Sequence, residues 1–316
     1  GNTTDHDEDL TMLRTRLTSR LTKPVLVCAM TALVFPWLAH AATTVDEHRA
    51  ANPQGAVEID NVAGAIDVQG WDKSEVAVSG TIGKDVERVE VTGDGNRTSV
   101  RVILPRGHTW GMTDGAAHLT VRVPANSSLA ASLVSSDLKV SAVRGGLELR
   151  TVSGNISGEG GGDLHANAVS GDIRFTATAA KVIEVKAISG DIVLTGGNGD
   201  IEATTVSGDA RLTLGTVSRA RFKTVSGNIS ATLAAAADAQ IEGESVSGDI
   251  KLDFASAPSA DFDMQTLSGD IDNCFGPKPT ESRHGAGARL TFKTGDSSAR
   301  VRVSTRSGDV RLCAKK

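Results

Sequence analysis

The sequence predicts an all-β protein, a parallel β-helix or β-solenoid with about 20 residues per coil and a cap at its N-terminal end. Three observations predict this fold. A short motif of Ser, Gly and then Asp or Asn recurs along the chain. The segments between its copies alternate apolar with polar side chains, which indicates strands. Glycine is abundant, with 34 residues, while aromatic residues make up only 3% of the chain.

The motif occurs eight times. Its Asp or Asn positions lie 17 to 21 residues apart as far as Asp270, for example 172 − 155 = 17 and 249 − 228 = 21. The next gap, 309 − 270 = 39, has the length of two coils. The Gly and the Asp or Asn of each copy are Gly154 and Asn155, Gly171 and Asp172, Gly190 and Asp191, Gly208 and Asp209, Gly227 and Asn228, Gly248 and Asp249, Gly269 and Asp270, and Gly308 and Asp309.

These motif residues are interpreted as a structural corner. Glycine can adopt positive φ, and the Asp or Asn that follows can accept hydrogen bonds from local backbone N–H groups, as in Asx turns. Weak cation binding between neighbouring coils is the alternative, because stacked carboxylates repel one another. Asn155 and Asn228 lack the charge that a row of Ca²⁺ sites would use, which favours the structural interpretation.

The residue after each Asp or Asn is expected to point into the core. Equivalent side chains of stacked coils lie about 4.8 Å apart, so these residues should form one internal ladder. Ala210 is its one small member. The others are Ile156, Ile173, Ile192, Ile229, Ile250, Ile271 and Val310.

Three regions follow from these patterns. Residues 1–41 are expected to be a leader and signal peptide. Residues 42–133 are β-rich but less regular, and they form either a small cap or the first part of the solenoid. Residues 134–316 form the repeat solenoid with a C-terminal cap, in which the irregular stretch 273–288 lies over the last coils.

Residues 1–41 have the pattern of an export signal. Basic residues precede an apolar run at 25–38, which ends in Ala39-His40-Ala41. Met12 is the expected true start and Ala41 the last residue before cleavage. A membrane span needs about 20 apolar residues, so a retained anchor is the weaker alternative and no stable span is expected after cleavage. The protein is therefore expected to be exported, to the periplasm or the cell surface.

Cleavage would leave two cysteines, Cys274 and Cys313. Disulfides persist in exported proteins, so these two are predicted to pair and to close a loop of 313 − 274 = 39 residues. Free thiols or a metal pair are the alternatives, but no cluster of His and Cys lies nearby to complete a metal site.

Charge and composition exclude some functions. The net charge of −5 arises from 38 acidic and 33 basic residues scattered along the chain, so no basic stripe is present and nucleic acid is not an expected partner. The chain has no Tyr and few other aromatic residues, which leaves few platforms on which a sugar could stack.

No catalytic, cofactor-binding or metal-ligating residue is predicted, and no cofactor. Histidines are scattered singly, and no common hydrolase or nucleotide-binding motif occurs. Charged residues at alternate strand positions predict a solvated outer face rather than a sugar-cleaving groove. The best candidates for a partner contact are His108 and Trp110, on an irregular stretch, with packing of Trp110 over the core end as the alternative.

Segments 61–72 (NVAGAIDVQGWD) and 119–125 (LTVRVPA), followed by the S-G-D-I series, resemble the bacterial putative adhesin family. The resemblance covers residues 50–313. It implies an exported or envelope-associated β-helix, and the family offers no catalytic residues to transfer. The expected function is a non-enzymatic, adhesin-like solenoid that binds an unidentified envelope protein or surface polymer. A periplasmic structural or signalling accessory is the first alternative, and a carbohydrate-active β-helix enzyme the second.

Overall fold

The computed structural model describes residues 43–105, 116–281, 287–296 and 298–314, which belong to one compact unit beginning at residue 41. All of its regular secondary structure is β, with 23 strands and no helix among the described residues. The predicted all-β class is confirmed. The leader, with its expected start and cleavage site, lies outside the described residues, as do His108 and Trp110.

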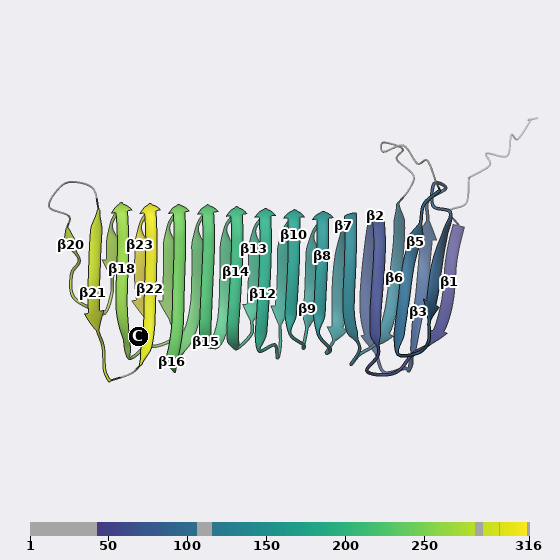
Figure 1. Cartoon of the computed structure of the whole chain (residues 1–316), viewed down its shortest axis with the longest axis horizontal. Helices are drawn as coiled ribbons and strands as arrows, with labels where there is room; N and C mark the ends of the chain where they lie inside the picture. The colour runs from purple at the N-terminus through teal and green to yellow at the C-terminus, as the bar shows by residue number, and fades with distance from the viewer. Residues whose placement is uncertain (1–42, 106–115, 282–286, 297, 315–316) are drawn as a thin grey trace, which may run out of the picture. The chain divides into compact units, whose positions relative to one another are not determined.

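The middle of the chain winds between two rows of parallel strands (Figure 1). Each motif corner ends a strand of one row, and the next strand lies in the other row. Leu164 aligns with Leu147 before it and with Ile183 after it, so equivalent residues of successive coils are neighbours. The first row contains β8 (Leu147–Ser153), β10 (Leu164–Ser170), β12 (Val182–Ser189) and β14 (Gly199–Ser207); the second contains β9 (Ile156–Gly160), β11 (Ile173–Ala177) and β13 (Ile192–Gly196).

Two longer strands continue both rows. The first part of β15 (Ala210–Ser226) pairs with β13, and its second part pairs with β14. The next strand, β16 (Ile229–Ser247), pairs with β15 in the same way along both parts. These pairings are parallel, as a solenoid requires, so each coil's backbone groups are satisfied by its neighbours.

The predicted internal ladder is present. Ile156, Ile173 and Ile192 align in register, and each is fully buried. Ala210 is also buried and continues the ladder to Ile229. Removing one such aliphatic side chain from water contributes about 1.5–3 kcal/mol, so this column contributes strongly to the stability of the stack.

At the C-terminal end the order of coils in space differs from their order in the chain. Strand β22 (Ala299–Ser307) lies between β16 and β18 (Ala260–Ser268), parallel to both. Strand β23 (Val310–Ala314) likewise lies between β17 (Ile250–Phe254) and β19 (Ile271–Asn273). Figure 1 shows these yellow strands among the green ones. The final coil is thus inserted between two coils that precede it in sequence.

Among the described residues of the two-period gap before Asp309, no extra parallel coil precedes β22. Instead β21 (Ala288–Lys293) pairs antiparallel with β18, and the short β20 (Thr280–Glu281) pairs with β21. Phe292 of β21 stacks on Phe262 of β18, with ring centroids 4.5 Å apart. This aromatic contact holds the antiparallel strand at the end of the stack.

The N-terminal end shows a related arrangement. Strand β2 (Ala56–Trp71) pairs in parallel with β7 (Ser128–Val143) on one side and with β5 (Arg97–Ile103) and β6 (Ala117–Pro124) on the other. Beyond them lie antiparallel strands: β4 (Arg88–Gly93) on β5, and β3 (Glu75–Ile82) on β6, with β1 (Thr43–Ala50) on β3. Strand β7 crosses residue 133, so the two rows run without a break through the proposed boundary there.

Within the described part of the chain, no helix is long and apolar enough to cross a membrane.

Candidate functional site

The corner glycines meet one another across coils. Their φ values lie between +142° and +157°, a region that other residues rarely adopt. A Cβ on Gly171 would lie 2.0 Å from the carbonyl oxygen of Gly154, and one on Gly208 would lie 2.1 Å from that of Gly190. Glycine is therefore required both by the backbone conformation and by the close stacking of the corners.

The Asp or Asn beside each glycine connects successive coils. The backbone N–H of Asp191 donates to Oδ1 of Asp172, and the N–H of Asp209 donates to Oδ1 of Asp191, both at 2.9 Å. The expectation of local Asx-turn bonding is wrong, because the N–H that each side chain satisfies lies one coil away. Stacking in register brings that N–H within hydrogen-bond distance of the side chain.

This Asx ladder, which comprises the corner Asp and Asn side chains, extends beyond the eight motifs. Its first member is Asp137, whose Oδ1 accepts from the N–H of Asn155 at 2.8 Å. Sequence inspection missed Asp137 because Ser136 replaces the motif glycine there, although the preceding Ser135 and the spacing carried a signal. At the other end the ladder follows space rather than sequence, from Asp249 to Asp309 and then to Asp270.

Electrostatics favour the ionised form of Asp172 in the ladder. The hydrogen bond from the N–H of Asp191 lowers the pKa of Asp172, and Arg174, 2.8 Å away, lowers it further. Arg211 contacts Asp209 at 2.7 Å and Asp191 at 3.3 Å. Backbone donors and arginines thus offset the repulsion between stacked carboxylates, which supports a structural role for the ladder.

A disulfide joins Cys274 to Cys313, with the two Cα atoms 4.9 Å apart. Cys274 follows β19 and Cys313 lies in β23, so the bond links the inserted coil to its outer neighbour. Asp272 lies beside the two sulfur atoms, but the thiols are consumed by the disulfide, so this group has no thiolate to offer a metal.

Charged side chains cover the outward face of the first row of strands. Arg221 contacts Glu242 at 2.9 Å, and Lys186 lies 3.8 Å from Glu202. The ammonium of Lys186 lowers the pKa of Glu184, and that of Lys223 lowers the pKa of Glu244. These ion pairs are partly exposed and, apart from Glu184–Lys186 within β12, they join neighbouring strands, as the sequence pattern predicts for a solvated face. The outward residues foreseen there are Glu184, Lys186, Glu202, Arg221, Lys223, Glu242 and Asp263.

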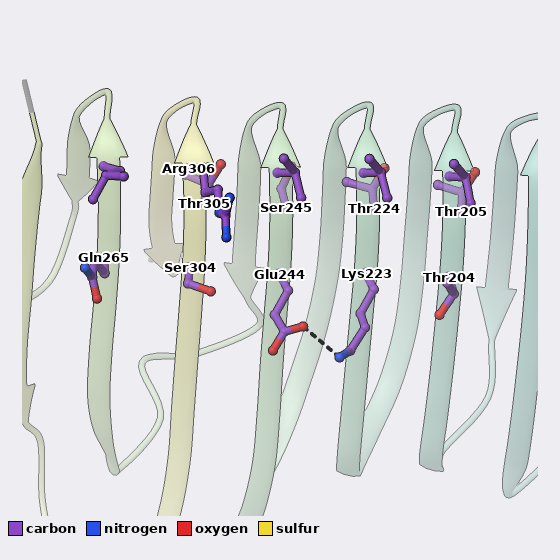
Figure 2. Close-up of a pocket in the computed structure, with 14 residues that line it drawn as sticks. Thr204, Thr205, Lys223, Thr224, Glu244, Ser245, Gln265, Ser304, Thr305 and Arg306 are labelled. Carbon is purple, nitrogen blue, oxygen red and sulfur yellow. Dashed lines mark ion pairs between the residues drawn. The ribbon is translucent and has the colours of Figure 1, made fainter.

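A groove of about 570 Å³ runs beside the corners, across β14, β15, β16, β22 and β18 (Figure 2). Figure 2 shows the ion pair between Lys223 and Glu244 on its polar wall. The opposite wall is mostly aliphatic. The polar wall comprises Thr204, Lys223, Glu244, Ser304 and Gln265, and the other wall comprises Val206, Val225, Val246, Arg306 and Leu267.

A second hollow, of about 230 Å³, is lined by four arginines: Arg219, Arg221, Arg300 and Arg302. We call it the basic hollow. Arg219 pairs with Asp200 at 3.0 Å, and Arg221 pairs with Glu242. Arg300 and Arg302 are exposed, and their guanidinium groups form no ion pair with another described residue.

The carboxylates that align with these two arginines have other cations. Arg300 lies beside Asp261 in the register, but Asp261 contacts Lys293 at 3.9 Å. Arg302 lies beside Asp263, which Arg289 contacts at 3.2 Å. The basic hollow therefore carries two guanidinium groups in excess of its neighbouring carboxylates, and this arrangement suits an anionic ligand.

Parallel strands stacked through an Asx ladder, with polar outward faces, define an all-β protein of solenoid-like fold. The Toastrack DUF4097 family matches residues 55–313, and the chain belongs to this family. No curated protein matches the chain.

Solved structures similar to this chain include two adhesin-like proteins. One is described as a putative adhesin from Bacteroides fragilis, with 11% identity, a TM-score of 0.43, and coverage of 86% of this chain and 97% of that one. Another is described as a putative adhesin from Parabacteroides distasonis, with 9% identity, a TM-score of 0.39, and coverage of 86% and 98%.

A third is described as a putative lipid binding protein, also from Parabacteroides distasonis. It has 10% identity, a TM-score of 0.32, and coverage of 84% of this chain and 96% of that one. At these identities and scores, no ligand or activity transfers to this chain.

Proposed function

We propose that this protein is an exported, non-enzymatic, adhesin-like solenoid that binds an anionic polymer or an acidic protein surface at the cell envelope. The observation that carries the proposal is the basic hollow. Its unpaired Arg300 and Arg302 are exposed on a strand that neighbours hold on both sides, so they are presented on a rigid surface. Guanidinium groups bind carboxylates, sulfates and phosphates with two parallel hydrogen bonds.

Export is supported by two features. The pattern of residues 1–41 matches a signal peptide with cleavage after Ala41, and the Cys274–Cys313 disulfide suits an oxidising compartment. The adhesin names of the similar structures agree with this proposal, although they concern other proteins.

The finer description of the fold is part of the same proposal. We take one coil to be about 20 residues, and the antiparallel strands β1, β3 and β4 to be an N-terminal cap that keeps other chains from pairing with the first coil. Residues 134–316 then form the repeat region with its own C-terminal cap.

Protease added to intact bacterial cells tests the location, with permeabilised cells as the control. Digestion on intact cells supports adhesion at the surface. Protection until permeabilisation instead supports the alternative, a periplasmic structural or signalling accessory.

Heparin, used as a polyanion probe, tests the basic hollow. Replacing both unpaired arginines (R300S/R302S) is expected to lower the salt concentration at which the protein leaves a heparin column. The matched control is R174S/R211S, which removes two arginines from the other row of strands, where they pair with ladder aspartates. If the wild type and the two variants elute at the same salt concentration, the basic hollow does not bind the polyanion. If the heparin chains become shorter, a carbohydrate-active enzyme is favoured instead.

A further inference from the structure

A row of exposed aliphatic side chains runs along the corners. In seven of the eight motifs the residue before the Ser is Val, Ile or Leu, and these side chains are 41–63% exposed. In the eighth motif this residue is Arg306. Six members occupy consecutive coils without interruption, and we call them the valine row: Val152, Val169, Ile188, Val206, Val225 and Val246.

The fold itself does not require aliphatic residues at these positions. Arg306 occupies the equivalent place, yet its corner keeps the inter-coil bond from the N–H of Asp309 to Oδ1 of Asp249, at 2.8 Å. The core beneath is already filled by the internal ladder. Exposed aliphatic side chains are unfavourable in water, and a contiguous series of them marks an interaction surface.

We propose that the valine row is the contact surface between two copies of this chain. The row repeats at about 4.8 Å, the spacing of neighbouring strands. Side chains of a partner can fit between successive members along the whole row only if the partner has the same repeat. A second copy of this chain has the same repeat. Two identical surfaces that contact each other are related by a twofold axis.

The flanking charges select an antiparallel arrangement of the two rows. The twofold axis runs parallel to the strands and passes between Ile188 and Val206. It places each coil of one copy opposite a defined coil of the other. Arg150 of one copy then faces Glu244 of the other and, by symmetry, Glu244 of the first copy faces Arg150 of the second. In this flanking row, two positions before each member of the valine row, uncharged partners face Lys186 and Lys223, so no like charges meet there. On the other side of the row, the flanking residues are the motif serines, which are uncharged.

The size of this surface agrees with a weak, concentration-dependent dimer. Six coils occupy about 29 Å of the stack, and three outward rows span about 14 Å along the strands. The footprint is therefore about 400 Å², half of the roughly 800 Å² that each partner contributes to a standard interface, and this smaller size is typical of a weak, reversible contact. The uncharged centre and polar margins also match the usual anatomy of such interfaces.

Sedimentation velocity of protein purified from cells expressing the full chain tests the proposal, over about 1–100 µM. The wild type is expected to dimerise. Lysines at the centre of the row (I188K/V206K) should weaken the dimer by about 100-fold or more, because each lysine faces the other across the axis. The matched control, T195K/T213K, adds two lysines to adjacent coils of the other row of strands and should remain dimeric.

The register is tested by cross-linking. R150C protein mixed with E244C protein should form an intermolecular disulfide on oxidation, whereas each variant alone should not. If circular dichroism shows that I188K/V206K does not fold, I188T/V206T replaces it, since threonine keeps the branched shape without a charge.

Three results would overturn the proposal: a monomer at every concentration, a dimer that I188K/V206K leaves intact, or cross-linking of R150C alone in place of the mixed pair. Binding of the monomeric wild type to phosphatidylcholine vesicles, lost in I188K/V206K, would also overturn it and assign the row to acyl chains. This inference is independent of the basic hollow, so R300S/R302S should dimerise normally.

Discussion

The middle coils and the C-terminal coils use the same corner in two different chain paths. From β8 to β16, each coil stacks on the coil that precedes it in sequence. At the C-terminal end, the coil of β22 and β23 lies between two coils that earlier parts of the chain form. The Asx ladder nevertheless passes through both regions with bonds of the same length, 2.8 to 2.9 Å.

This comparison separates two roles of the repeat. The corner motif determines how two neighbouring coils fit, while the connections between strands determine which coils become neighbours. A motif that can accept any other copy does not specify order. The repeat alone would allow the coils to stack in sequence order at the C-terminal end as well. There, the antiparallel β21 and the disulfide hold the inserted coil in its place.

The largest predicted difference between the two regions concerns removal of a whole coil. Deleting residues 172–190 joins Gly171 to Asp191 and keeps the motif and the register, so the shortened stack should fold with a lower melting temperature. Ending the chain at residue 298 removes β22 and β23 and leaves β16 and β18 without a partner between them, so the strands after β16 should lose their resistance to protease while the middle coils stay folded. Circular dichroism and limited proteolysis measure both, and a truncated chain that resists protease throughout would refute the role of the insertion.

The next effect concerns the corner glycines. Replacing Gly208 by alanine should destabilise the protein by more than about 4 kcal/mol, because positive φ is strained for alanine and its Cβ would overlap a backbone oxygen 2.1 Å away. Gly243 is the control, since its Cβ would meet only side-chain atoms at 3.4 Å or more. G243A should be neutral or stabilising by up to about 1 kcal/mol. Urea unfolding gives both values, and similar losses in the two variants would contradict the stacking argument.

Loss of the disulfide should destabilise the C-terminal end specifically. In the chain-entropy model, a bond that closes a 39-residue loop contributes about 3–4 kcal/mol. C274S/C313S should therefore melt at a lower temperature, and limited proteolysis should begin near β22 and β23. Cleavage that begins instead in the middle coils would show that the inserted coil does not depend on the bond.

The smallest effect concerns acid stability at one ladder position. The pKa of Asp172 is lowered by the fold, so its contribution to stability is present above its unfolded pKa and is lost as the pH falls through its folded pKa. This window lies below about pH 4. D172N keeps an oxygen for the N–H of Asp191, as Asn155 and Asn228 do elsewhere, and it should lose less stability between pH 6 and pH 3, by about 1 kcal/mol at most. Thermal melts at pH 6 and pH 3 measure the loss of stability in the wild type and in D172N. D172A, which lacks the oxygen, is measured in the same way for comparison.

Sequence patterns predicted the corners and the internal ladder because both repeat at a period that one chain displays by itself. The glycines at positive φ and the buried Ile192 follow from local rules. The hydrogen-bond partner of each Asp could not be predicted in this way, because the N–H that it accepts from belongs to a neighbouring coil. The inserted coil could not be predicted because its motif, Gly308 and Asp309, is equivalent to all the others.

The candidate surfaces were harder to predict than the fold. The valine row carried a visible signal, an apolar residue before the Ser in seven motifs, but its exposure depends on which way the corner turns. The basic hollow joins Arg219 and Arg221 to Arg300 and Arg302, which are about 80 residues further along the chain (300 − 219 = 81). Only the insertion of β22 beside β16 brings them together.

The insertion also gives the strands at this end an order of closure. Strands β16 and β18 precede β22 in the chain, yet β22 lies between them in the folded protein. Until β22 pairs with β16, the edge of β16 that faces β22 has no partner from the preceding coils, and its backbone N–H and C=O groups are open to pairing with another chain. The inserted coil is therefore also the element that removes an aggregation-prone strand edge.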